Sequence, residues 1–148
     1  MNSTINLIFT IVGAALTLLT IYGAVKMDRK LFLSGICYFS FLPIIGESLS
    51  YNTDQAPIHI MVISIFLVQF VLTLPIKITF GPDNLAAVKI VAKISIALLI
   101  INVAATVYIF CLKAGVPAQF GYYHIVISLA IVYLIIKRIS SNGTIMLK

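Results

Sequence analysis

The chain has 148 residues, of which 61% are hydrophobic and 9% charged, and its formal net charge is +6 at pH 7. A soluble domain of this size carries about 25% charged residues and leaves roughly 30% of its unfolded surface in contact with water, so the composition excludes a soluble globular protein. The positive charges lie at the ends of apolar segments and are not interleaved with aromatic residues in a polar segment. They therefore indicate membrane topology signals, and we expect no nucleic-acid partner.

Five apolar segments are each long enough to form a helix that crosses the roughly 30 Å hydrocarbon core of a bilayer. They are about twice the length of a barrel strand and lack its polar alternation. The sequence therefore predicts an all-α polytopic integral membrane protein. Residues 1–148 form one bundle of five transmembrane helices with no soluble domain. The predicted spans are about residues 5–25, 31–50, 58–76, 85–112 and 120–136.

The basic residues alternate between the two sides of this predicted bundle. The first and third connections and the C-terminal tail hold nine Lys and Arg, whereas the other side holds only Lys113. Positive residues favour the cytoplasmic side, so we predict that the N-terminus lies outside and the C-terminus in the cytoplasm. The isoleucine-rich helices without tryptophan suggest a bacterial inner membrane. The residues expected to contact lipid headgroups are Lys26, Arg29, Lys30, Lys89, Lys93, Lys137 and Arg138.

The first span carries a stripe of polar and small residues at alternating spacings of four and three, which places them on one helix face. Small residues allow close approach of helix backbones, and hydroxyl groups can bond across helices. We interpret this face as a packing seam within the bundle or with another subunit. The alternative is one wall of a hydrophilic pathway. The residues are Asn6, Thr10, Gly13, Thr17, Thr20 and Ala24.

The second span contains Pro43, Gly46 and Glu47 in its outer part. Because proline has no N–H, Pro43 leaves the carbonyl of Phe39 without its helical donor and predicts a kink. We also expect the backbone of this outer part to be irregular. A carboxylate inside a membrane is costly and commonly functional. Glu47 is therefore either a functional group or an interfacial anchor.

Two amides lie near the middle of their spans, Gln69 in the third and Asn102 in the fourth, with Thr73 one turn beyond Gln69. An amide at the centre of a bilayer requires a hydrogen-bond partner. We predict that Gln69 and Asn102 bond to each other across two helices. They either hold the bundle together or line a path for a substrate or ion.

The two histidines, His59 and His124, lie towards the outward ends of the third and fifth spans, and we expect them at similar depth, near Glu47 and Asp54. Histidine and carboxylate side chains can bind a divalent metal, and paired histidines can bind haem iron. A metal or haem site at His59, His124 and Glu47 is one hypothesis, although the sequence predicts no cofactor outright. Motifs typical of hydrolases, nucleotide-binding proteins and dinucleotide enzymes are missing, so we do not expect an enzyme.

Three functions remain open. The first hypothesis is a non-catalytic integral membrane subunit of a larger membrane complex, with the polar and small-residue faces in assembly. The second is a small homo-oligomeric channel or transporter with a polar path near Gln69 and Asn102. The third is the outer-leaflet metal or haem protein. Each implies membrane lipids and either other integral membrane subunits or further copies of this chain as partners.

Overall fold

The computed structural model describes residues 3–75, 84–112 and 115–140, and every regular element in these residues is a helix. The described chain is therefore all-α, as the sequence predicts. Some predicted features lie outside the described part of the chain. They are the boundaries of the third span near residue 76, the basic residues Lys77, Lys113 and Lys148, and the side chain of Arg138. The helices are α1 (Ser3–Lys26), α2 (Arg29–Phe39), α3 (Phe41–Asp54), α4 (Pro57–Thr73), α5 (Asn84–Cys111) and α6 (Ala118–Ser140).

Four helical segments of the described chain are long and apolar enough to cross a membrane, namely Thr4–Lys26, Arg29–Asp54, Lys89–Cys111 and Ala118–Lys137. The fifth apolar helix, α4, has 17 residues. At 1.5 Å per residue it is about 25 Å long, slightly less than the hydrocarbon core. The described chain is thus all-helical, with four to five helices apolar enough to span a bilayer.

The second predicted span is interrupted shortly before Pro43. Helices α2 and α3 meet at Ser40, which stays in the right-handed helical region with φ −61° and ψ −23°. Pro43 lies three residues later and cannot donate to the carbonyl of Phe39. The interruption of the helix at Ser40 agrees with this missing donor, and the kink itself stays a prediction. The expectation of an irregular backbone after it is wrong, because α3 is a regular helix through Gly46 and Glu47 to Asp54.

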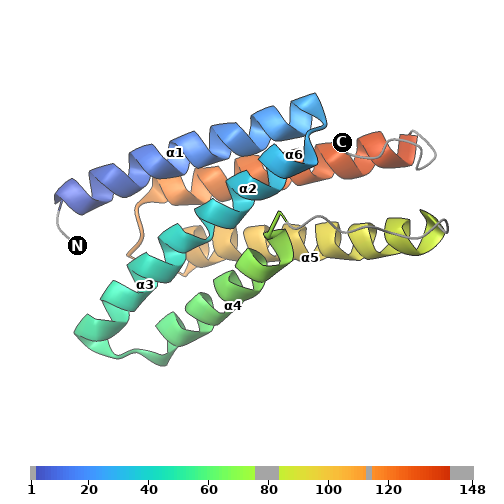
Figure 1. Cartoon of the computed structure of the whole chain (residues 1–148). Coiled ribbons are helices and arrows are strands. Elements are labelled where there is room, and N and C mark those ends of the chain that lie inside the picture. The colour runs from blue at the N-terminus through green and yellow to red at the C-terminus, as the bar shows by residue number, and fades with distance from the viewer. Residues whose placement is uncertain (1–2, 76–83, 113–114, 141–148) are drawn as a thin grey trace.

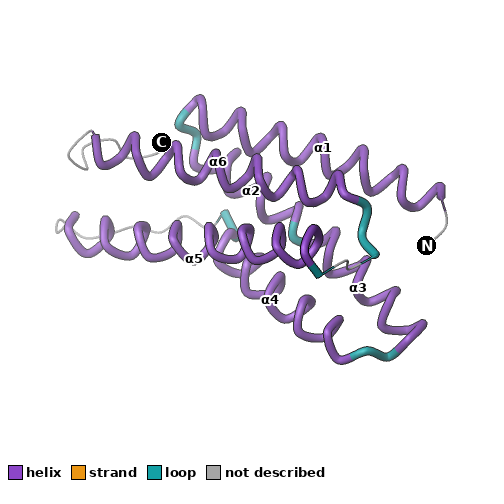
Figure 2. The backbone as a smooth tube through the Cα atoms, turned by 180° about the vertical axis from the view of Figure 1, so that it is seen from behind, coloured by secondary structure: helices purple, strands orange, loops and turns teal. Residues whose placement is uncertain are grey.

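The helices run back and forth and form a closed ring (Figures 1 and 2). Helix α1 packs against α2 and α6, α6 packs against α5, α5 against α4, and α4 against both α2 and α3. The beginnings of α1, α4 and α6 lie at the same end as the last residues of α3 and α5. We call this the α3–α4 end, after the turn that connects those two helices. The connection between α1 and α2 lies at the opposite end.

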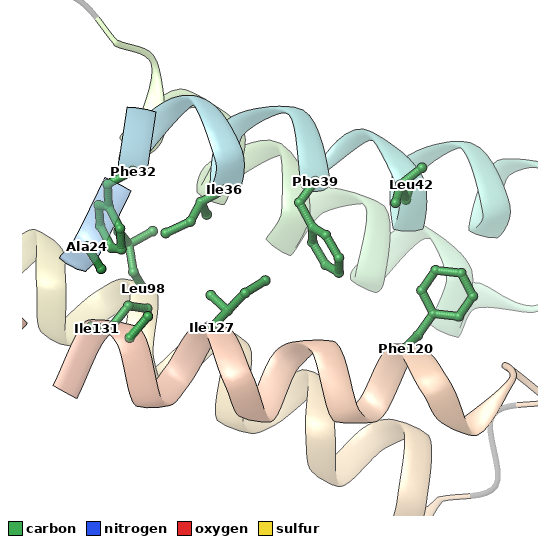
Figure 3. Close-up of a cluster of buried hydrophobic side chains, with 10 residues drawn as sticks. Ala24, Phe32, Ile36, Phe39, Leu42, Leu98, Phe120, Ile127 and Ile131 are labelled. Carbon is green, nitrogen blue, oxygen red and sulfur yellow. The ribbon is translucent and has the colours of Figure 1, made fainter. Parts of the chain in front are cut away.

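The half of the ring towards that opposite end is filled with apolar side chains. Residues of α2 and α3 face α6 across the centre, with Leu98 of α5 between them (Figure 3). Close backbone contact between α1 and α2 completes this half. A Cβ atom on Gly23 would lie 2.3 Å from the Phe32 nitrogen, and one on Gly35 would lie 2.3 Å from Thr20 Oγ1. The buried cluster contains Ala24, Phe32, Ile36, Phe39, Leu98, Ile127, Ala130 and Ile131, and it extends towards the α3–α4 end with Leu42 and Phe120.

The small and polar face of α1 lies inside the ring. Gly13, Thr17, Thr20 and Ala24 are buried, whereas Asn6 and Thr10 are half-buried. The backbone of Gly13 lies against the Tyr123 ring of α6, and the Tyr123 hydroxyl donates to the Thr10 carbonyl at 3.1 Å. This face therefore packs against neighbouring helices of the same chain.

Candidate functional site

A chain of hydrogen bonds joins four segments of the bundle at mid-depth. Gln69 of α4 donates from Nε2 to Ser40 Oγ at 3.1 Å, and Asn102 of α5 donates from Nδ2 to Gln69 Oε1 at 2.9 Å. The Oδ1 atom of Asn102 lies 2.8 Å from Nδ1 of His124 on α6. We call these four residues the polar chain. The predicted hydrogen bond between Gln69 and Asn102 is confirmed, and both residues are fully buried.

The pattern of donors fixes the role of His124. Asn102 uses Nδ2 to donate to Gln69 and to the Leu98 carbonyl, so its Oδ1 is the acceptor and the Nδ1 atom of His124 carries the proton. The ring of His124 packs against the rings of Phe39 and Phe66, with centroids 5.2 and 5.5 Å away. Its other nitrogen, Nε2, has no hydrogen-bond partner among the described residues.

Thr73 supports the polar chain without extending it. Its hydroxyl donates to the carbonyl of Gln69 at 2.7 Å, one turn earlier on the same helix. Thr106 does the same for the carbonyl of Asn102 at 2.9 Å. These hydroxyl groups are satisfied within their own helices. The side chains of Gln69 and Asn102 and the hydroxyls of Thr73 and Thr106 are thus engaged with each other and with the backbone, which is the arrangement expected of structural contacts between helices.

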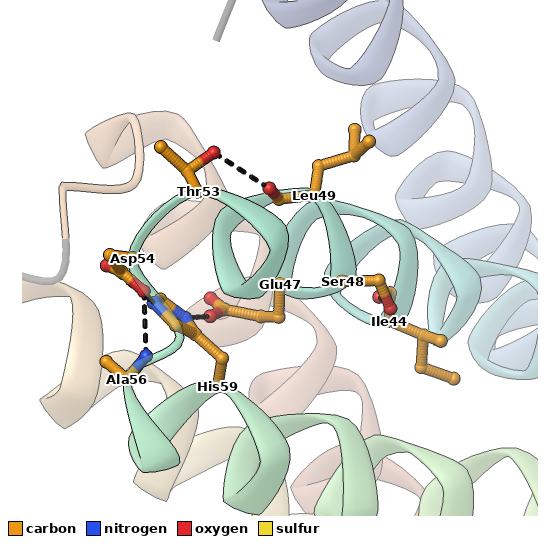
Figure 4. Close-up of polar contacts among 8 residues, drawn as sticks. All are labelled: Ile44, Glu47, Ser48, Leu49, Thr53, Asp54, Ala56 and His59. Atoms are coloured by element: carbon orange, nitrogen blue, oxygen red, sulfur yellow. Dashed lines mark hydrogen bonds and ion pairs between the residues drawn. The ribbon is translucent and has the colours of Figure 1, made fainter.

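A second polar group lies at the α3–α4 end. Nδ1 of His59 bonds to Glu47 Oε2, and Nε2 of His59 lies 3.0 and 3.1 Å from the two carboxylate oxygens of Asp54 (Figure 4). The side chains of Glu47 and His59 are 8% and 10% exposed, whereas that of Asp54 is 56% exposed. We call Glu47, His59 and Asp54 the acid–histidine cluster. The predicted proximity of His59 to both acids is confirmed.

The geometry of the cluster assigns its charge. With both acids ionised, a histidine whose two nitrogens each face a carboxylate donates from both and is an imidazolium. One imidazolium and two carboxylates leave a net charge of −1 on the cluster. The turn itself is ordered by Asp54, whose Oδ1 accepts the backbone N–H of Ala56 at 2.9 Å. Gln55 in between adopts the left-handed conformation, with φ 55°.

A cavity of about 210 Å³ opens at the α3–α4 end of the ring. Helices α1, α3, α4, α5 and α6 all contribute residues to its wall. Glu47 and His124 are among the polar residues in that wall. Gln69 and Asn102 are not part of it. The cavity is lined by Asn6 and Phe9 of α1, by Leu42, Pro43, Gly46, Glu47 and Ser50 of α3, by Val62 and Phe66 of α4, by Ala105, Tyr108 and Ile109 of α5, and by Gly115, Val116, Pro117, Phe120 and His124.

The described basic residues lie away from this cavity. Lys26, Arg29 and Lys30 flank the turn between α1 and α2, while Lys89 and Lys93 lie in the first part of α5 and Lys137 near the end of α6. These positions are at the end of the bundle opposite to the α3–α4 turn (Figure 1). Of the residues described as lining the cavity, none is Lys or Arg. The ring therefore has one basic end and one end with acidic groups.

The three residues predicted as metal or haem ligands fall into two groups. Glu47 and His59 bond to each other, while His124 belongs to the polar chain with Asn102. In the described chain, no group of three or more His, Cys, Asp or Glu side chains is arranged to hold a metal ion. His124 is the seventh residue of α6, which begins at Ala118, so it lies deeper in the bundle than the sequence analysis expected.

Two features of the site escaped sequence reasoning. Ser40 is one of several serines in the second span, and nothing in the sequence indicates that its hydroxyl accepts a hydrogen bond from Gln69. His124 had a usable signal, because counting residues from the ends of α5 and α6 places it near the depth of Asn102. No protein-family model matches the chain, and no match was found among curated proteins or solved structures.

Proposed function

We propose that this protein is a membrane-embedded binding component that holds a small, largely apolar ligand in the cavity at the α3–α4 end. The observation that carries this proposal is the cavity of about 210 Å³ with walls from α1, α3, α4, α5 and α6. Protein interiors are close-packed and contain few voids larger than a water molecule. An apolar cavity of about 150 Å³ is large enough to bind benzene, so this one has room for a ligand of about eight non-hydrogen atoms.

The composition of the wall supports a specific ligand more than it supports a packing defect. Ligand sites are mostly apolar with a few polar groups that orient the ligand. Here the aromatic and aliphatic side chains surround Glu47, Tyr108 and His124. The polar chain holds the His124 ring in place at the inner part of the cavity. The site is thus built from positioned side chains.

The inner half of the ring supports a binding role over an open channel. Beyond the polar chain the centre is filled by the apolar cluster around Ile36, Leu98 and Ile127, whose side chains are at most 2% exposed. The side-chain amides of Gln69 and Asn102 already bond to each other, and Gln69 also bonds to Ser40. A water-filled path along these two residues therefore has no support in this arrangement.

We further propose five membrane crossings, with the N-terminus outside and the C-terminus in the cytoplasm of a bacterial inner membrane. The gathering of Lys26, Lys30, Lys93 and Lys137 at one end of the ring supports this orientation. The cavity and the acid–histidine cluster then face the outside. The ligand would enter from that side of the membrane.

The test of the proposal fills the cavity without disturbing the backbone. A Cβ atom on Gly46 would have only Phe9 Cε2 within 4 Å, at 3.8 Å, so larger side chains fit at this position. We expect Gly46→Leu to fold and to abolish binding of benzyl alcohol to the protein in nanodiscs, measured by saturation-transfer NMR. Gly46→Ala is the matched control, because it brings the same gain in helix propensity but leaves most of the cavity open. Equal binding to both variants, or no binding to the unaltered protein, would overturn the proposal.

A second candidate function is a non-catalytic subunit of a larger membrane complex. The observation that favours it is a shallow groove on the outer surface of α4, lined among the described residues by Leu67, Val68, Val71 and Leu72. Such a groove fits a neighbouring transmembrane helix as well as lipid chains.

The native mass of the gently extracted protein tests this second candidate function. Stoichiometric co-purification of a different membrane protein supports it, and a monomer or homo-oligomer contradicts it.

A further inference from the structure

We infer that the ligand of the cavity is a small organic monocation with an aromatic or aliphatic body, held by the carboxylate of Glu47. This inference rests on the proposed binding function and adds the chemical class of the ligand. It is carried by the charges and the aromatic rings of the cavity wall.

The described part of the cavity wall carries a negative charge at Glu47. Glu47 lines the cavity and uses Oε2 for His59, while its Oε1 has no hydrogen-bond partner among the described residues. Glu47 is the acidic residue among the described lining residues, whereas Asp54 lies outside the wall. A buried carboxylate in apolar surroundings interacts strongly with a cation, because little water screens the pair. No described lining residue supplies a competing positive charge from Lys or Arg.

The position of Glu47 is fixed by its partners. His59 holds one carboxylate oxygen, and Asp54 holds the far nitrogen of the His59 ring. Glu47 and His59 come from α3 and α4, which the turn at Gln55 joins. A carboxylate oriented in this way loses little conformational freedom when a ligand binds, which favours affinity.

The aromatic rings of the wall suit the same class of ligand. Phe9, Phe66, Tyr108 and Phe120 all line the cavity and come from four different helices. The faces of aromatic rings attract organic cations, and cages of such rings are a common way to bind ammonium groups. An apolar anion would instead meet Glu47 at close range. A neutral ligand would gain the apolar contacts without the ion pair.

The experiment compares three ligands of nearly equal size, benzylammonium, benzyl alcohol and benzoate, on the protein in nanodiscs at neutral pH, with empty nanodiscs as background. We expect benzylammonium to bind at least tenfold more tightly than benzyl alcohol and benzoate to bind most weakly. Glu47→Gln keeps an acceptor for His59 but removes the charge. It should eliminate the preference for benzylammonium and leave binding of benzyl alcohol within about twofold.

Asp54→Asn is the matched control, because it removes a carboxylate from the same cluster at an exposed position outside the cavity wall. It should retain most of the preference for benzylammonium. The ranking of the three ligands on the unaltered protein tests the inference even where Glu47→Gln does not fold. If benzyl alcohol binds as tightly as benzylammonium, the cation inference is overturned while the proposed binding function stands. If none of the three binds, both are overturned.

Discussion

Asn102 and Gln69 join α5 to α4 through a hydrogen bond of 2.9 Å between two fully buried amides. Each amide also reaches a further segment, because Gln69 donates to Ser40 and Asn102 accepts from His124. In the core of a bilayer there is no water to replace these hydrogen-bond partners. The contact therefore specifies which helices are neighbours and at which register they pack.

The first prediction concerns the unequal importance of these two amides. Asn102→Leu removes the acceptor of His124 and the donor to Gln69, so it leaves two buried polar groups without partners. It should lower the free energy of unfolding by about 2–3 kcal/mol, whereas Gln69→Leu should cost about 1–2 kcal/mol. The measurement is a denaturant titration of the protein in micelles.

The double variant of Gln69 and Asn102 isolates their direct contact. We expect a coupling free energy of roughly 1 kcal/mol from the double-mutant cycle. Asn52→Leu and Gln119→Leu change the same residue types at exposed positions and serve as controls. A coupling near zero would mean that the hydrogen bond contributes nothing to stability.

The second prediction concerns the acid–histidine cluster. His59→Ala removes the partner of the buried Glu47 carboxylate and should lower the Tm by roughly 5 °C. Hydrogen exchange should increase chiefly in α3 and the beginning of α4. Asp54→Asn should have a smaller effect, because Asp54 is largely exposed and solvent screens its charge. Equal effects of the two variants would show that burial of Glu47 is irrelevant to the stability of the turn.

The sequence predicted the features that depend on composition or on one residue's chemistry. The apolar segments predicted the membrane helices, and the missing N–H of Pro43 predicted a disturbance of the second span, which is interrupted at Ser40. The need of Gln69 and Asn102 for partners at similar depth predicted their hydrogen bond. These inferences require only distance along one helix and the rule that buried polar groups are satisfied.

The features that depend on helix neighbours were not predictable. One sequence does not reveal that α6 lies beside both α1 and α5, and this arrangement is what brings His124 to Asn102. The cavity was equally unpredictable from the sequence, because it lies where Gly46 and Ala105 leave space between larger side chains of five helices. Its existence depends on the packing of the whole ring.

The third prediction tests the close approach of α1 and α2. A methyl group on Gly35 would lie 2.3 Å from Thr20 Oγ1 and 2.8 Å from the Thr20 nitrogen, so the helices would have to separate. We expect Gly35→Ala to lower the free energy of unfolding by about 2 kcal/mol. Gly46→Ala meets no such obstruction and should be neutral or slightly stabilising. Equal stability of the two variants would contradict the observed packing.

The last prediction tests the orientation and the number of crossings together. In a background with Cys37→Ala and Cys111→Ala, single cysteines are introduced by Asn52→Cys in α3 and by Lys137→Cys in α6, both at exposed positions. Helices α4, α5 and α6 lie between these positions. If each of them crosses the membrane, the two cysteines are on opposite sides. A membrane-impermeant maleimide should then label Asn52→Cys in intact spheroplasts and Lys137→Cys only after permeabilisation. The reverse pattern would invert the proposed orientation. Labelling of both cysteines from the same side would mean an even number of crossings between the two positions. The 17-residue helix α4 would then be the helix that does not span the bilayer.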